Sequence, residues 1–317
     1  MRNAFFRALY ALAERDERVF LIVGDLGFGV VEPFAERFPE RFLNVGVAEQ
    51  NMTGIAAGLA LCGKIVFTYS IANFPILRCL EQVRNDVCYH KANVKIVAVG
   101  GGLAYGALGS THHATEDIAI MRALPEMLVV APGDPQEAEA ATRAIAEHPG
   151  PCYLRLGRAG EPNVHPQKLS FELGRAIRVL EGDDITLIST GGLLQTAVQV
   201  AELLRPMGLQ ARVLSMHTIK PLDGEAVLSA AQETRAIFAR EEHSTTGGLG
   251  GAVAEVLAEA DHGLPIFRRF GLPSAFASTV GTQEHLRSQY GLSPQSLVAA
   301  IRLALEKDRS FANAAGS

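Results

Sequence analysis

Apolar residues recur along the first half of the chain in two alternating patterns. Short apolar runs indicate buried strands, and longer segments with apolar residues three or four positions apart indicate helices. The expected strands are 19–23, 64–68, 94–99, 127–131 and 152–156, and the expected helices are 3–15, 48–61, 74–89, 115–124 and 135–147. Strands that alternate with helices predict an α/β domain with a largely parallel sheet.

The alternation breaks between Gly157 and Phe171, in a segment with Gly and Pro residues that predicts a linker. A second series follows, with strands expected at 185–189, 212–215, 236–239 and 266–270 and helices at 193–204, 224–231, 252–260, 283–288 and 294–306. We therefore predict two doubly wound α/β domains, at 1–160 and 176–317, joined by a linker at 161–175. The tail, 311–317, is expected to be frayed.

The composition is typical of a globular protein with a substantial core. The chain has 317 residues, of which 48% are hydrophobic and 20% charged, with a formal net charge of -5. No basic block compensates for this charge, which argues against nucleic acid as a partner. No apolar run is long enough for a membrane span, and the N-terminus lacks the pattern of a signal peptide. The four cysteines show no zinc-type spacing, so we expect no metal site on this chain and a reduced, cytoplasmic protein.

Glu49 is the first candidate for chemistry. It lies in the segment NVGVAEQNM, and the apolar spacing from Ala48 to Leu61 places it in the first turn of a mostly buried helix. The helix dipole favours a carboxylate there, but burial is unfavourable unless a specific partner meets the charge. Spacing alone leaves two interpretations open: an exposed and replaceable acid at a helix start, or a buried carboxylate with a dedicated partner.

The segment VGVAEQNM resembles the pyrimidine-binding domain of thiamine-diphosphate enzymes of the transketolase family. Other motifs stand in family order, namely GDLG at 24–27 before it, and 67–85, 94–127 and 152–158 after it. The whole chain resembles the second half of a transketolase, a pyrimidine-binding domain followed by a C-terminal domain. The similarity is greatest to split transketolases, in which two polypeptides share the work of one long chain.

This resemblance implies a cofactor site. Glu49 matches the glutamate that hydrogen-bonds a ring nitrogen of the cofactor's aminopyrimidine, so that the cofactor can deprotonate its own thiazolium carbon. Phe74 matches the aromatic residue that stacks on the pyrimidine, and Ile71 stands where the family often places a second aromatic. Asp25 and Val47 match residues near the cofactor. From the residues alone, Phe74 is equally a core residue and Asp25 equally a turn or helix cap.

The resemblance also implies substrate contacts. His112, in a Thr-His-His segment, matches the histidine of the family's Thr-His-Gln signature. Histidine titrates near neutral pH and suits hydrogen-bond exchange with a substrate hydroxyl or carbonyl oxygen. Arg158 and Arg2 match arginines that hold a sugar-phosphate tail, because a planar guanidinium pairs with two phosphate oxygens. Arg155, within the strand, is expected only to make a salt bridge. The paired histidines have no third ligand at usable spacing, so we do not favour a metal site.

Three departures from the family pattern concern sugar recognition. Leu108 replaces an aspartate that recognises a sugar hydroxyl, Gly100 replaces a substrate-facing histidine, and a phosphate-binding serine is lost within 27–29. A buried Leu108 would leave that hydroxyl without a hydrogen bond typically worth about 1–3 kcal/mol. We therefore expect a specialised, less hydroxylated substrate rather than the pair used by a housekeeping pentose-phosphate transketolase.

The family's site for the diphosphate and magnesium needs a Gly-Asp-Gly motif followed further along by Asn, which this chain lacks. The resemblance therefore implies a partner subunit that supplies the diphosphate-binding domain and holds most of the thiamine diphosphate and its Mg²⁺, in an α2β2 assembly with the active site at the interface. The Gly-rich segment 240–250 lacks dinucleotide-binding spacing, so we favour a structural turn there.

The leading interpretation is a subunit of a heteromeric, thiamine-diphosphate-dependent transferase of the transketolase type. It would move a ketol or acyl unit from a ketose, ketose phosphate or 2-oxo acid donor to an aldehyde acceptor. Two alternatives stay open: the β subunit of a 2-oxoacid dehydrogenase E1, which shares both domains and the glutamate, and a non-catalytic scaffold subunit. Segments 121–125 and 154–158 favour the transketolase, and retention of Glu49, Phe74 and His112 argues against a scaffold.

Overall fold

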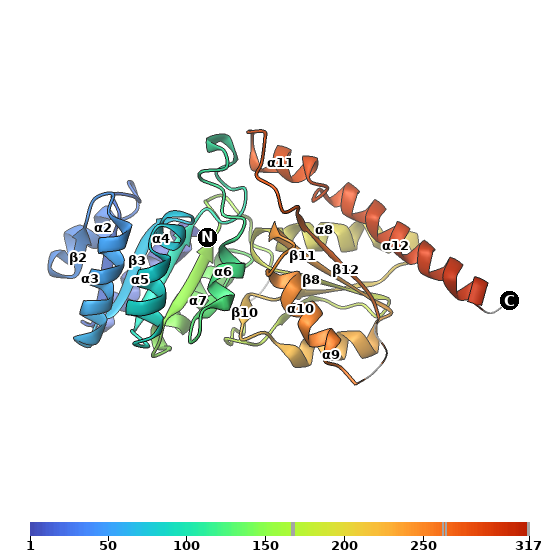
Figure 1. Cartoon of the computed structure of the whole chain (residues 1–317), viewed down its shortest axis with the longest axis horizontal. Coiled ribbons are helices and arrows are strands. Elements are labelled where there is room, and N and C mark those ends of the chain that lie inside the picture. The colour runs from blue at the N-terminus through green and yellow to red at the C-terminus, as the bar shows by residue number, and fades with distance from the viewer. Residues whose placement is uncertain (166–168, 262, 264, 316–317) are drawn as a thin grey trace.

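Two α/β units lie side by side in the computed structural model, which describes residues 1–165, 169–261, 263 and 265–315 (Figure 1). Each unit has one central sheet with helices packed on both faces, so the predicted fold class is confirmed. Of the predicted linker at 161–175, residues 166–168 lie outside the described residues. The described part of that segment contains no helix or strand.

The first sheet has the strand order β10-β5-β6-β4-β3-β1-β2. Its strands are β1 (Val19–Val23), β2 (Phe42–Asn44), β3 (Ile65–Ile71), β4 (Val94–Val99), β5 (Leu128–Val130), β6 (Cys152–Leu156) and β10 (Thr218–Lys220). Neighbouring strands are parallel except β10 and β5. Strands β3, β4 and β6 are buried at every position, because helices cover both faces of the sheet.

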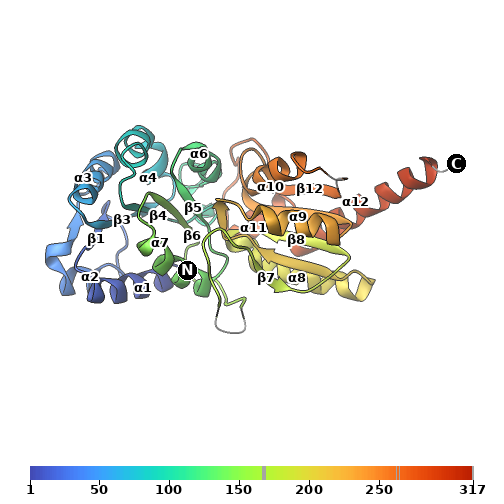
Figure 2. The ribbon, with the colours of Figure 1, turned by 90° about the horizontal axis from the view of Figure 1, so that it is seen from below.

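Figure 2 shows the helices on the two faces of this sheet. One face carries α1 (Arg2–Arg15), α2 (Glu32–Arg37) and α7 (Pro135–Glu147); the other carries α3 (Glu49–Leu61), α4 (Phe74–Leu77), α5 (Leu80–Gln82), the π-helix η2 (Val83–Cys88) and α6 (Asp117–Ala123). A short turn, η1 (Pro39–Arg41), leads into β2. Helix α7 starts at Pro135 because the side chain of Asp134 accepts a hydrogen bond from the amide of Glu137.

The single helix expected at 74–89 is wrong. Helix α4 ends at Leu77, Cys79 has a non-helical φ of -126°, and α5 and η2 follow as separate turns. Apolar residues continue at helical spacing through the break, so the pattern does not reveal it. Strands β2, β7 (Ile177–Leu180) and β10 were also missed, because each is short and mixes apolar with polar residues.

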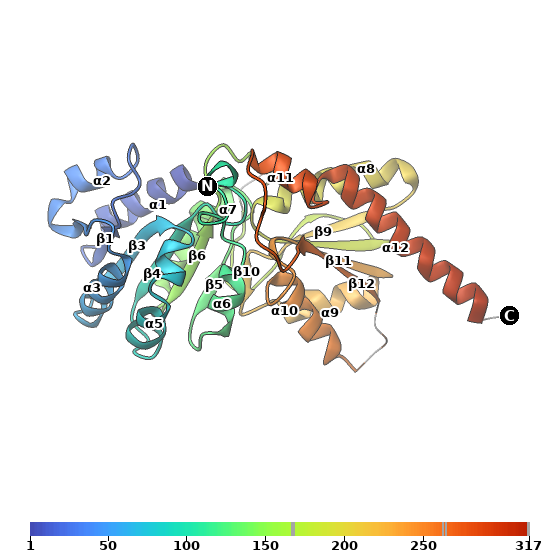
Figure 3. The ribbon, with the colours of Figure 1, turned by 45° about the horizontal axis from the view of Figure 1, so that its top comes forward.

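The second sheet has the order β12-β11-β8-β9-β7. Its strands are β7 (Ile177–Leu180), β8 (Ile185–Ser189), β9 (Ala211–Ser215), β11 (Ala236–Ser244) and β12 (Ile266–Leu272), and only β7 runs antiparallel to its neighbour. Its helices and turns are η4 (Gly191–Leu193), α8 (Leu194–Leu204), η5 (Arg205–Met207), α9 (Gly224–Glu233), α10 (Leu249–Ala258), α11 (Gln283–Gln289) and α12 (Pro294–Ala315). Helices α8 and α12 pack on one face and α9 and α10 on the other (Figure 3).

Two helix ends differ most from the expectation. Helix α12 extends to Ala315, so 311–315, predicted to be frayed, are helical, and 316–317 lie outside the described residues. Helix α10 begins at Leu249 rather than at Ala252. The buried carboxylate of Glu241 accepts hydrogen bonds from the amides of Leu249 (2.6 Å) and Gly250 (2.8 Å), which fills this helix N-terminus from within the chain. This cap by Glu241 is the physical reason for the structural turn predicted in the Gly-rich segment.

A buried polar network joins the two units. Arg155 donates to Asp117 at 2.6 Å and to the carbonyl oxygen of Glu242 at 3.0 Å, and the Tyr153 hydroxyl donates to Asp117 at 2.6 Å. The salt bridge expected of Arg155 is confirmed. Burial raises the pKa of Asp117, but the charges of Arg155 and His243, together with the hydrogen bonds from Arg155 and Tyr153, outweigh it and hold that pKa below its usual range. The network fixes the carboxyl end of β6 against β11.

Candidate active site

Glu49 lies at the first turn of α3 and is only 3% exposed. The chain reaches it through Gly46, whose φ of +73° is a conformation that favours glycine. Gly24, at the end of β1, lies next to the carboxylate: a Cβ added there would be 3.8 Å from Glu49 Oε1, an ordinary van der Waals contact. Nη1 of Arg78 donates to both carboxylate oxygens at 3.1 Å. Of the two interpretations, the exposed acid is therefore wrong, and Glu49 is a buried carboxylate with a specific partner.

Phe74 and His112 lie beside this ion pair. Phe74 is the first residue of α4, and the guanidinium carbon of Arg78 lies 4.0 Å from the centroid of its ring. The His112 ring meets the Phe74 ring edge-on, with the centroids 5.3 Å apart. His112 Nδ1 is 3.0 Å from the Thr111 hydroxyl oxygen. The structure thus brings Glu49 and Phe74 together at Arg78, and His112 against Phe74.

Arg78 was missed by the sequence analysis. Its spacing of four residues from Phe74 is a usable signal, because residues i and i+4 of a helix share a face.

His113, the residue after His112, replaces the family's usual glutamine. It is buried, and its Nε2 lies 3.4 Å from the carbonyl oxygen of Gly106. Burial lowers the pKa of His113, which favours the neutral form of its ring.

The other three predicted cofactor residues lie at the ends of neighbouring strands. Asp25 is exposed with a φ of +57°, and it exchanges hydrogen bonds of 3.0 and 3.1 Å with the Asn44 side chain. That pair ties the end of β1 to the end of β2, which gives Asp25 a structural partner. Val47 is 74% exposed, whereas Ile71 is 9% exposed and belongs to the core cluster against which Phe74 packs.

The predicted arginines form a second group around Tyr105. The guanidinium carbon of Arg158 lies 5.4 Å from the centroid of the Tyr105 ring. Burial raises the pKa of Tyr105, and the positive charges of Arg158 and Arg2 oppose that rise. Neither Arg2 nor Arg158 forms an ion pair with any residue that the structure describes. Two uncompensated cations therefore act on one phenol.

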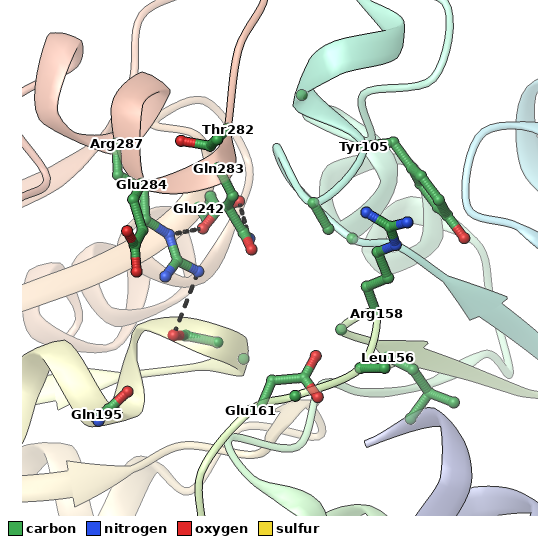
Figure 4. A pocket seen from close by; sticks show the side chains of 18 of the residues that line it. Tyr105, Leu156, Arg158, Glu161, Gln195, Glu242, Thr282, Gln283, Glu284 and Arg287 are labelled. Atoms are coloured by element: carbon green, nitrogen blue, oxygen red, sulfur yellow. Dashed lines mark hydrogen bonds and ion pairs between the residues drawn. The ribbon is translucent and has the colours of Figure 1, made fainter.

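A cleft of about 590 Å³ opens between the two units next to Arg158. Figure 4 shows Tyr105 and Arg158 on one side, and Glu242, Gln283 and Arg287 on the opposite side. Arg287 donates to Glu242 and to the carbonyl oxygen of Gly192, so it is already committed within the chain. The cleft lies at the carboxyl ends of β4, β6, β8 and β11, where α/β sheets commonly bind ligands.

Tyr105 also explains how the chain accommodates Gly100. Gly100 has a φ of +86°, and a Cβ on it would collide with Cδ2 and Cε2 of the Tyr105 ring. The ring thus occupies the space that a side chain at position 100 would fill. Leu108, at the end of the short turn η3 (Gly106–Leu108), is 53% exposed and not buried, so the burial expected of it is wrong and the cost inferred for a buried leucine does not apply.

Sequence profiles of known protein families match nearly the whole chain. The transketolase pyrimidine binding domain matches residues 1–161, and the transketolase C-terminal domain matches residues 174–297. The chain belongs to the transketolase family. It is a transketolase subunit, and its class of enzyme is transferase.

Relatives of this transketolase subunit are themselves named as subunits of transketolases. It is 41% identical over 298 residues to the B subunit of the apulose-4-phosphate transketolase of Phocaeicola vulgatus, covering 93% of this chain and 94% of the relative. It is 38% identical over 309 residues to SqwH, a subunit of the 6-deoxy-6-sulfo-D-fructose transketolase of a Clostridium species, covering 97% and 95%. A solved structure described as a split gene transketolase, inactive β4 tetramer, matches with 40% identity and a TM-score of 0.89, covering 96% of this chain and 98% of that one.

Membership of the transketolase family implies thiamine diphosphate, and the residues around Glu49 fit its pyrimidine end. A buried carboxylate whose cation partner is half-exposed can accept a hydrogen bond from a polar ring. The adjacent Phe74 ring offers a flat apolar face.

Among the residues that the structure describes, no group of three or more His, Cys, Asp or Glu side chains could hold a metal ion. No helix in the described part of the chain has the length and apolarity to cross a membrane.

The tight packing of Gly100 against Tyr105 predicts a large effect on the stability of the transketolase subunit. We expect Gly100→Ala to lower the free energy of unfolding by about 1–3 kcal/mol, because the alanine is strained at positive φ and its Cβ meets the ring. Gly63→Ala is the matched control, since Gly63 has a φ of +87° with no atom within 4 Å of the added Cβ. Thermal unfolding measures both. Equal losses of stability would show that backbone strain alone governs position 100.

Proposed function

We propose that this chain is the pyrimidine-binding subunit of a two-subunit transketolase that moves a ketol unit between sugars carrying a terminal oxyanion. The observation that carries the proposal is the buried carboxylate of Glu49, paired with Arg78 beside the Phe74 ring, which in turn contacts His112. A carboxylate that is 3% exposed is unfavourable to retain unless it meets a defined polar partner.

When bound, thiamine diphosphate supplies a carbon that adds to a ketose carbonyl and stabilises the negative charge left when the neighbouring carbon–carbon bond breaks. Glu49 would hold a pyrimidine ring nitrogen by a hydrogen bond and share a proton with it. The low-dielectric surroundings of a buried carboxylate strengthen such a bond. The ring of Phe74 would stack against the pyrimidine and fix its plane.

His112 would handle the substrate's oxygens. Its Nδ1 already engages the Thr111 hydroxyl, so Nε2 is the nitrogen left to exchange a proton or a hydrogen bond with a hydroxyl or carbonyl group. The edge of its ring rests on Phe74, which keeps the imidazole beside the pyrimidine end of the site. Among Glu49, Phe74, Arg78 and His112, the imidazole is the side chain that offers both a hydrogen-bond donor and an acceptor.

Arg158, Arg2 and Tyr105 would hold the substrate's anionic end. The relatives' names specify a sugar phosphate in one case and a sulfonated sugar in the other, and both groups are tetrahedral oxyanions. A guanidinium without an ion-pair partner binds either group through paired N–H donors. The loss of a side chain at Gly100, with Tyr105 in its place, supports a substrate that differs from the housekeeping pentose phosphates.

A partner subunit would supply the diphosphate-binding domain and Mg²⁺. Two similar relatives are named as single subunits of transketolases, and the similar structure containing only β chains is described as inactive. Large apolar side chains stand exposed next to the site residues, with Val47 near Glu49 and Leu77 next to Arg78. Contiguous exposed apolar patches mark protein-binding surfaces, and these two side chains would contribute to one. An α2β2 assembly would place the cofactor between the two kinds of chain.

The experiment is to express the chain with the product of a neighbouring reading frame that carries Gly-Asp-Gly and a later Asn. Ketol transfer is then measured with a panel of phosphorylated, sulfonated and neutral sugars. We expect activity in the mixture, little in either chain alone, and a preference for anionic sugars. Full-rate transfer between xylulose 5-phosphate and ribose 5-phosphate would overturn the specialised substrate. Inactivity of the complex despite tight assembly would favour the scaffold alternative.

A further inference from the structure

We propose that, in the cofactor-free subunit, the guanidinium of Arg78 occupies the position between Glu49 and Phe74 that the pyrimidine ring would take. The cofactor must then displace this guanidinium in order to bind. The inference rests on the proposed function of Glu49 and Phe74. It assigns to Arg78 control over cofactor affinity, which neither the family match nor the named relatives specify.

The guanidinium makes both contacts that the proposed function reserves for the pyrimidine. Its Nη1 donates to Glu49 Oε1 and Oε2, at 3.1 Å each, and its carbon lies 4.0 Å from the centroid of the Phe74 ring. A guanidinium is flat, carries N–H donors and stacks on aromatic faces, so it satisfies the same two surfaces as a protonated aminopyrimidine. One flat group fills that space, so the two cannot bind there together.

The partners of this ion pair differ sharply in exposure. The Glu49 side chain is 3% exposed, and within the described residues Arg78 is its one ion-pair partner, whereas the Arg78 side chain is 48% exposed. An isolated buried carboxylate is strongly unfavourable, so Arg78 compensates the charge of Glu49 while no pyrimidine ring is bound. Arg78 itself can turn into solvent without leaving a buried charge behind.

The contact is also weaker than a fixed arginine site in the same chain. One nitrogen of Arg78 bridges the two carboxylate oxygens, so the two-nitrogen fork that makes the strongest pairs is not used. Arg155, by comparison, is 5% exposed and binds Asp117 through Nε and Nη2 as well as two backbone carbonyls. Arg78 is therefore the exchangeable arginine and Arg155 the structural one.

Removing the guanidinium should favour the cofactor. In the complex of this chain with its partner, freed of cofactor, we expect Arg78→Met to lower the dissociation constant of thiamine diphosphate with Mg²⁺ by about three- to tenfold, because no ion pair has to be broken first. Arg78→Lys keeps the charge but loses the stacking plane, and it should fall between the two. Arg84→Met, an exposed arginine on η2, is the matched control and should leave the constant unchanged.

Isothermal calorimetry gives the dissociation constants. Thermal unfolding of the cofactor-free complex provides a readout independent of loading: Arg78→Met and Glu49→Gln should show non-additive shifts in melting temperature, because they remove the same pair. If the wild-type complex binds the cofactor but Arg78→Met binds equally or more weakly, the inference fails while the proposed function stands. If the wild-type complex binds no cofactor, the proposed function fails and this inference with it.

Discussion

Glu49→Gln should leave an assembled enzyme with almost no turnover. We expect the rate of ketol transfer to fall by about 10³-fold, within the usual range for loss of a group that shares a proton. Glutamine has nearly the shape of glutamate and fits the space beside Gly24, but its amide cannot take up a proton from a ring nitrogen. Steady-state kinetics of the complex, with cofactor saturating, provides the measurement.

The fold should survive this change. Glu49→Gln alters one oxygen of a side chain that faces Arg78 rather than the apolar core, so association with the partner should persist. Glu81→Gln, at an exposed position in α5, is the control and should keep normal turnover. Near-normal activity in Glu49→Gln would remove Glu49 from the mechanism and leave its burial as a purely structural feature.

Arg158→Met should weaken the binding of anionic sugars more than it slows their reaction. Losing charge-assisted hydrogen bonds to a phosphate or sulfonate is worth about 1.5–3 kcal/mol, which raises KM by about 10- to 100-fold. The effect on kcat should be smaller, because Arg158 lies with Tyr105 at the interdomain cleft and not beside Glu49, Phe74 and His112. Kinetics with one sugar in its phosphorylated and neutral forms measures the difference.

The neutral sugar is the internal control for this prediction, since its KM should be the same in wild type and Arg158→Met. Arg143→Met, an exposed arginine on α7, is the matched variant and should change neither constant. A similar rise in KM for both forms of the sugar would show that Arg158 shapes the cleft without recognising the anion.

Much of the fold could be predicted because burial imposes a period on the sequence. The five-residue strands β1 and β6 were placed with their observed bounds, since their runs are bounded by Arg18 and Gly24 in one case and by Pro151 and Gly157 in the other. The break at Cys79 could not be predicted, because buried apolar residues continue at helical spacing on both sides of it. The attachment of β10 to the first sheet depends on the packing of the two units, which no local pattern records.

The candidate site divides in the same way. Motif resemblance selected Glu49, Phe74 and His112. In the structure, Arg78 contacts both Glu49 and Phe74, and the Phe74 ring contacts His112. Their roles, and those of Asp25, Val47, Ile71, Arg2 and Arg158, stay predictions. Arg78 and Tyr105 were not selected, because their importance arises from what they touch: Arg78 pairs with Glu49, and Tyr105 fills the space at Gly100. Exposure of Leu108 likewise depends on the turn that carries it.

The central claim is that this chain holds half of a cofactor site and that a second chain completes it. Calorimetric titration of thiamine diphosphate and Mg²⁺ into the chain alone, the partner alone and the two together tests it most directly. We predict no measurable binding to the chain alone and saturable binding to the mixture, with one cofactor for each pair of chains. Binding to the isolated chain as tight as binding to the mixture, or no binding in any combination, would contradict the account.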